Sequence, residues 1–274
     1  MSTKNIKKSS DGEAPKKRKI SAVSILHYYK LIFRSILFIL AIIWYVYNRY
    51  NDITINIHNS IDVTINMNWA VLVIDIIYII EMMLRLFPSK LESPGCQKQF
   101  KGNYKPTGET DVVLHDNHAV VIVALIWIVL NGIIGALYMT DVIDEGILWL
   151  VCLLYGICDM ICILFFCPFQ TWFLKNKCCA SCRIYNWDFA MMFTPLFFIP
   201  GIMTWSLLAL AMVIMIRWEI TVWLYPERFS ENTNQYLACA NCSEKLCVHK
   251  KQLISFRKSL ISYADATIKR ILQR

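Results

Sequence analysis

The sequence predicts an all-α, polytopic integral membrane protein: a helical bundle of about six spans with a small extracytoplasmic β-hairpin and a cytoplasmic Cys-rich module. Three observations support this fold class. The 274 residues are 57% hydrophobic, against about 45–50% in soluble domains. The apolar residues form runs of about 18 or more, the length that crosses ~30 Å of hydrocarbon. Lys and Arg residues concentrate in alternate connecting segments, as they do around membrane spans.

Residues 1–30 are predicted to form a disordered, basic N-terminal tail. This stretch contains KNIKKSS and PKKRK and few apolar residues, so burial cannot offset the entropy of ordering it. No cleavage site for a signal peptide follows the first apolar run, which is therefore expected to remain as an anchor. Beside a membrane span, such a tail favours anionic lipid headgroups as its partners over nucleic acid.

The membrane bundle is predicted to occupy residues 31–224. Four spans are expected near residues 31–47, 69–86, 119–139 and 146–167. Residues 189–224 are expected to form a broken hairpin of two short or partly re-entrant passes. The block is barely long enough for two crossings, and Pro195, Pro200 and Gly201 supply the helix breaks that it needs. One long kinked span is the alternative, so five or six crossings remain open.

The distribution of positive charge predicts the orientation of these spans. Basic residues gather up to Arg34, between Arg85 and Lys105, between Lys175 and Arg183, and from Arg217 onward. Because cytoplasmic loops are rich in Lys and Arg, the N-terminus is expected in the cytoplasm, and so is the C-terminus if the last block crosses twice. The protein is thus expected in the cell (cytoplasmic) membrane. In the opposite loop, apolar and polar residues alternate over 53–67, which predicts a β-hairpin.

Two C-x-x-C pairs predict a zinc site. Cys179 with Cys182, and Cys239 with Cys242, each follow the end of an apolar block by a short distance. Two such turns aim four thiolates at one tetrahedral ion. Zinc is therefore the expected cofactor, and it would join the loop after the fourth span to the C-terminal tail. Three further residues are secondary candidate ligands: Cys178, Cys247 and His249.

Other uses of these cysteines are less favoured. An iron–sulfur cluster is the second choice because the closely spaced four-cysteine runs of ferredoxins are absent. Disulfides are disfavoured because a cytoplasmic location keeps thiols reduced. Residues 225–274 are predicted to form a cytoplasmic Cys-rich tail that ends in an amphipathic basic helix. That helix suits an anionic leaflet, a partner protein or a second copy of the chain.

Three polar residues inside the predicted spans are candidate functional residues: Asp75, Asn131 and Asp159. Because a charge in hydrocarbon is costly, such residues face the bundle interior, a partner or water. They are interpreted either as helix-packing residues or as a polar path in which Asp75 and Asp159 bind a cation. Glu81 and Arg85, four residues apart, are expected to pair with each other near the interface.

The sequence favours a non-enzymatic function but leaves it undecided. It contains no nucleotide-binding loop and no hydrolase or metalloprotease motif. The leading hypothesis is a membrane protein with a structural or regulatory cytoplasmic zinc site. The first alternative is a cation or metal transporter or channel that uses Asp75 and Asp159. The second is a membrane oxidoreductase with a metal or iron–sulfur centre.

Overall fold

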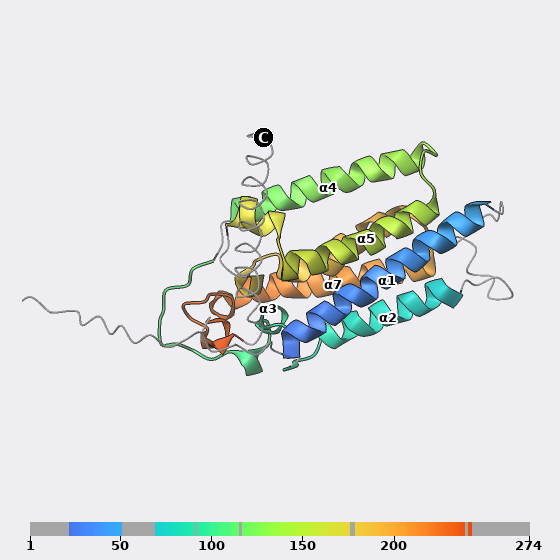
Figure 1. The fold of residues 1–274 in the computed structure, drawn as a ribbon. Helices are drawn as coiled ribbons and strands as arrows, with labels where there is room; N and C mark the ends of the chain where they lie inside the picture. The colour runs from blue at the N-terminus through green and yellow to red at the C-terminus, as the bar shows by residue number, and fades with distance from the viewer. Residues whose placement is uncertain are drawn as a thin grey trace, which may run out of the picture.

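The computed structural model describes residues 22–50, 69–90, 92–114, 117–175, 179–238 and 241–242. Five long helices lie side by side in one bundle (Figure 1). They are α1 (Ala22–Tyr50), α2 (Trp69–Arg85), α4 (Asn117–Met139), α5 (Glu145–Leu164) and α7 (Ile202–Leu224). No strand occurs in the described ranges, where the one β-type contact is an isolated bridge between Pro106 and Asn234.

The multi-pass membrane prediction is confirmed by four of these helices. In the part of the chain that the structure describes, α1, α4, α5 and α7 are long and apolar enough to cross a membrane. α2, with 17 residues, is slightly shorter and runs along the same bundle (Figure 1). Large apolar side chains stay exposed along α1 and α4, such as Ile39, Ile43, Ile128 and Val129. Such surfaces are stable against lipid chains, which are as apolar as the side chains themselves.

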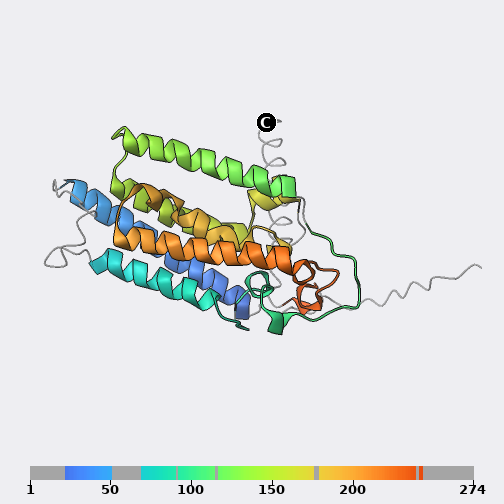
Figure 2. The same ribbon diagram turned by 180° about the vertical axis from the view of Figure 1, so that it is seen from behind.

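Short elements gather where α1 and α4 begin and where α2, α5 and α7 end; we call this the loop-rich end (Figures 1 and 2). They include α3 (Pro94–Gln97), η1 (Lys101–Asn103), η2 (Phe169–Leu174), η3 (Cys179–Ser181), η4 (Tyr185–Trp187), η6 (Pro226–Arg228) and η7 (Gln235–Leu237). The tight turn between α4 and α5 lies at the opposite end. The loop-rich end therefore holds both the segment that follows α5 and the segment that follows α7.

The chain returns across the bundle between η4 and α7 by a short path. α6 (Asp188–Phe193) is followed by η5 (Thr194–Phe198), and both lie against α5 and α7. At one end of this segment, the Trp187 indole donates a hydrogen bond to Glu219, late in α7, at 2.8 Å. At its other end, Phe198 packs on Gly135, late in α4. Pro195 and Pro200 prevent a continuous helix here, and α7 starts anew at Ile202.

This returning segment forms the centre of the bundle core. Its buried side chains are Phe189, Met192, Phe193, Leu196 and Ile199. They pack with buried residues of α2, α5 and α7, such as Met82, Cys152 and Leu207. A second core cluster fills the loop-rich end, around Trp218, Phe229, Tyr185 and Cys96. The apolar content of residues 189–199 is thus used for helix packing inside the protein.

Some predicted boundaries differ from the structure. α1 begins at Ala22, so part of the predicted tail of residues 1–30 is helical, and Ser24 and His27 in it are buried. The reason is packing: the first turns of α1 lie against other elements of the loop-rich end. The predicted hairpin at 53–67, the tail before Ala22 and the amphipathic C-terminal helix lie outside the described residues.

Candidate functional site

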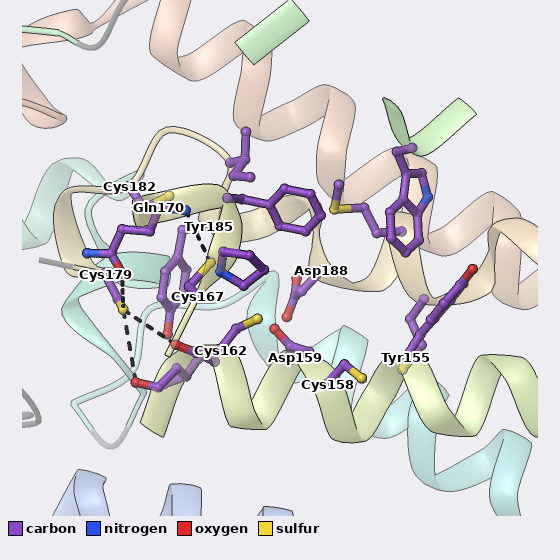
Figure 3. Close-up of a pocket in the computed structure, with 17 residues that line it drawn as sticks. Tyr155, Cys158, Asp159, Cys162, Cys167, Gln170, Cys179, Cys182, Tyr185 and Asp188 are labelled. Carbon is purple, nitrogen blue, oxygen red and sulfur yellow. Dashed lines mark hydrogen bonds between the residues drawn. The ribbon is translucent and has the colours of Figure 1, made fainter. Parts of the chain in front are cut away.

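A thiol-rich cavity of about 270 Å³ lies at the loop-rich end, between α4, the end of α5 and the segment 167–192 (Figure 3). Five cysteines line it: Cys158, Cys162, Cys167, Cys179 and Cys182. Two carboxylates, those of Asp159 and Asp188, also line it, and Trp127 of α4 closes one side. The cavity therefore combines sulfur, aromatic rings and two acidic groups in a mostly apolar wall.

Gln170 forms hydrogen bonds both to the turn that carries Cys179 and Cys182 and to Cys167, just after the end of α5. Cys179 donates its thiol hydrogen to the Gln170 side-chain oxygen at 3.1 Å, and its sulfur also lies 3.9 Å from the carbonyl oxygen of Cys162. The backbone N–H of Gln170 donates to the sulfur of Cys167 at 3.4 Å. Pro168 separates α5 from η2, so the chain can turn back here. Sequence reasoning missed Gln170, because a single polar residue in an apolar run carries no spacing signal.

Lys98 fixes the backbone of the same turn. Its side chain is 1% exposed, and its ammonium group donates hydrogen bonds to the carbonyl oxygens of Ala180 at 3.0 Å and Cys182 at 3.2 Å. The ammonium group also lies over the rings of Trp218 and Phe229, at 5.0 and 5.2 Å from their centroids. From the sequence this lysine was only one of the basic residues that orient the spans. Its partners come from distant parts of the chain, so no local pattern reveals its role.

The surroundings of Cys182 favour its neutral thiol form. Burial away from water raises the pKa of Cys182 to about 12, and the nearby Lys98 ammonium group only partly opposes this shift. Desolvation disfavours the charged thiolate. A metal ion that binds Cys182 must therefore displace its proton, and the affinity falls as the pH is lowered.

The structure describes part of the predicted zinc quartet. Cys179 and Cys182 lie on one turn, η3 and the residue that follows it, and Cys242 is half-buried after η7. Among the described residues no three His, Cys, Asp or Glu side chains are grouped so as to hold a metal ion. The fourth thiol, Cys239, and the secondary candidates lie outside those residues: Cys178, Cys247 and His249. η3, which begins at Cys179, and η7, which precedes Cys242, both contact the short helix α3.

The charged residues of the spans pair across helices. Arg34 of α1 lies 3.4 Å from Asp159 of α5 and 3.1 Å from Glu81 of α2. Arg85 pairs with Asp188 at 2.6 Å, and both side chains are less than a tenth exposed. The expected pairing of Glu81 with Arg85 is therefore wrong. Each residue reaches a partner on another element, because burial strengthens such contacts beyond what an exposed i,i+4 pair provides.

The other two candidate polar residues of the spans do not line the cavity. Asp75 is fully buried in α2, and neither of its carboxylate oxygens has a hydrogen-bond partner among the described residues. Asn131 is also buried, and its amide donates to the carbonyl oxygen of Trp127 in its own helix at 3.0 Å. Of the three intramembrane polar residues, only Asp159 lines the cavity.

Comparison of the chain with protein-family models, with curated proteins and with solved structures found no match.

Proposed function

We propose that this chain is a multi-pass protein of the cytoplasmic membrane whose loop-rich end binds zinc through Cys179, Cys182, Cys239 and Cys242. The ion has a structural or regulatory role and clips the loop after α5 to the tail after α7. The observation that carries the proposal is that α7 ends at the loop-rich end, where η3 lies (Figure 1). The tail therefore starts beside the first C-x-x-C pair, and both η3 and η7 contact α3.

The residues around Cys179 and Cys182 suit a structural metal turn. Lys98 holds the carbonyl oxygens of Ala180 and Cys182, so the turn is ordered before a metal ion arrives. The Lys98 ammonium group also places positive charge beside the thiolates, which partly offsets the charge of a four-thiolate site. Thiolate sulfurs bind zinc at about 2.3 Å in a tetrahedron.

Binding of a metal ion would stabilise the segments that carry the ligands. The 3-10 turns η3 and η7 contain three residues each, and such short turns form few hydrogen bonds of their own. The free energy of structural zinc binding is added to the free energy of folding in such segments. Zinc would therefore act as a crosslink between two regions that are far apart in the sequence.

Metal analysis of the purified full-length protein tests this proposal. We expect about one zinc ion per chain, lost in Cys182→Ser and in Cys239→Ser, because each variant removes one of four thiolate ligands. Cys158→Ser is the matched control: this cysteine is exposed and lies outside the predicted quartet, so zinc should be retained.

Equal zinc contents in the three variants, or a metal-free wild-type protein, would refute the proposal. A coloured preparation that contains iron would instead favour the iron–sulfur centre of an oxidoreductase. Metal analysis and visible absorption of the same wild-type sample therefore distinguish zinc from an iron–sulfur cluster.

A cation path is a second candidate function, favoured by the buried carboxylate oxygens of Asp75, which have no hydrogen-bond partner in the described part of the chain. A buried carboxylate inside a span is typical of ion and proton sites. Asp159 is a weaker candidate because it already pairs with the Arg34 guanidinium. Cation flux into vesicles that is lost in Asp75→Asn, with zinc content unchanged, would favour this alternative.

A further inference from the structure

The thiol-rich cavity extends along the membrane-spanning part of α5. Tyr155, Cys158 and Cys162 line it from successive turns of that helix, and Trp127 faces them from the middle of α4 (Figure 3). The rings of Trp127 and Tyr155 lie 4.7 Å apart and close the deep end. The cavity is therefore reached at the depth of the hydrocarbon as well as at the loop-rich end.

One side of the cavity opens toward the bilayer. α4 contacts η2 and η5, and the rings of Trp127 and Tyr155 join it to α5. The ties to η5 are the hydrogen bond from the Trp127 indole to the Thr194 hydroxyl, at 3.2 Å, and the contact of Phe198 with Gly135. Cys158 lines the cavity and is also exposed. Because the exposed surface of a spanning helix contacts lipid, a chain from the bilayer can enter beside Cys158.

The chemistry of the wall favours an apolar ligand. The remaining lining residues are mostly apolar or aromatic: Ile163, Pro168, Phe169, Ile184, Tyr185, Met191 and Met192. The two carboxylates are already paired, Asp159 with Arg34 and Asp188 with Arg85, so they are not free to bind a cation. The volume of about 270 Å³ is close to the ~300 Å³ at which ligand pockets begin. It accommodates part of one acyl chain and excludes a whole two-chain lipid.

We infer that this cavity binds part of a single acyl chain, supplied either by a free fatty acid or by one chain of a membrane phospholipid. The methyl end lies toward Trp127 and Tyr155, in the hydrocarbon. The polar end lies toward Gln170 and Cys179, where the cavity reaches the loop-rich end (Figure 3). Cys179 and Cys182 line this cavity and are also two of the proposed zinc ligands, but the inference rests on the apolar lining and needs no bound metal ion.

Photolabelling of the full-length protein in lipid nanodiscs tests the inference. Two probes are used, a fatty acid and a phosphatidylcholine, each with a diazirine on the same 16-carbon chain, and cross-links are mapped by mass spectrometry. We expect cross-links to cavity residues such as Phe169 and Met191 that an excess of unlabelled fatty acid or phospholipid removes. The probe that labels these residues identifies the source of the chain.

A matched pair of variants locates the binding site. Cys158→Trp fills the mouth of the cavity and should abolish these cross-links. Ile161→Trp places the same ring on the lipid-exposed surface of α5, outside the cavity, and should leave them unchanged. Cross-links that are confined to the exposed faces of α1 and α4, or that are equal in both variants, would overturn the inference.

A measurement on the wild-type protein needs no variant. Saturating fatty acid or phospholipid should slow alkylation of Cys158 and Cys162 by N-ethylmaleimide, because an acyl chain covers both thiols. Free cysteine added to the same sample, which no cavity covers, should react at an unchanged rate. Alkylation of the two cavity thiols that is insensitive to lipid would also overturn the inference.

Discussion

Lys98 lies under the Cys179–Cys182 turn and is the residue that determines its backbone geometry. It is fully buried, yet its ammonium group finds two carbonyl acceptors and two aromatic faces. A buried charge is tolerated only when it is paired or fully hydrogen-bonded. The lysine and the turn therefore stabilise each other.

Replacing Lys98 with Met tests this role. Met keeps the apolar stem but leaves the Ala180 and Cys182 carbonyl oxygens without their donor, and each orphaned group costs about 1–3 kcal/mol. We expect a lower unfolding temperature in detergent and faster alkylation of Cys182, measured by mass spectrometry. Lys90→Met, at an exposed position, should change neither. Unaltered stability and Cys182 reactivity in Lys98→Met would show that the turn holds its shape without this lysine.

The charged residues of the salt bridges are tolerated inside the spans because each of them pairs with an opposite charge. Arg34 pairs with both Glu81 and Asp159, Lys30 also pairs with Glu81, and Arg85 pairs with Asp188. Each pair joins two different elements, so each also fixes how those elements pack. A buried pair is costly to break because one charge is left without a partner.

At the scale of elements, the segment α6–η5 depends on close contact with its neighbours. Phe198 at the end of η5 lies directly on Gly135 of α4, and a Cβ atom at that glycine would overlap the Phe198 ring. Met192 of α6 packs in the same way on Gly156 of α5, where a Cβ would lie 2.8 Å from its sulfur. Small residues of this kind allow close helix packing in membranes.

Two glycine substitutions in α4 separate packing from helix propensity. Gly135→Ala should destabilise the protein by about 1–3 kcal/mol, because the added methyl group overpacks against Phe198. Gly132→Ala meets no atom within 4 Å and should leave stability unchanged or raise it, since Ala favours helix. Thermal unfolding of both variants in one detergent gives the comparison. Equal effects would mean that α4 does not pack on η5 in solution.

At the scale of the whole molecule, the structure brings the start of α1 and the end of α7 to one end of the bundle (Figures 1 and 2). The segment α6–η5 makes this possible, because it carries the chain back across the bundle before α7 begins. With a single kinked crossing in this region, the tail would leave from the opposite end.

This arrangement predicts the sidedness of the termini. Epitope tags before Ala22 and after the C-terminus should be accessible from the same side of sealed vesicles. A tag in the turn at Asp141, between α4 and α5, should be accessible only from the other side. Protease protection measures all three. If the two terminal tags are found on opposite sides, the paired-crossing arrangement and the zinc proposal both fail.

The spans were predictable because their cause is local. A run of apolar residues long enough for the hydrocarbon must form a helix there, since the backbone polar groups have no other partner. The predicted spans at 119–139 and 146–167 therefore nearly coincide with α4 and α5. The breaks at Pro195 and Pro200 also follow from local chemistry. The start of α1 could not be predicted from local chemistry, because Ser24 and His27 are buried by elements that are distant in the sequence.

The sequence by itself determined a multi-pass helical membrane protein, since hydropathy and chain breakers act within a few turns of one segment. It also located the two C-x-x-C pairs as candidate metal ligands. Only the tertiary structure decided that Lys98 holds the first pair, that Arg34 pairs with Asp159, and that five thiols line one cavity. These contacts join residues from separate helices and turns. The packing of one element against another, which no local pattern encodes, decides them.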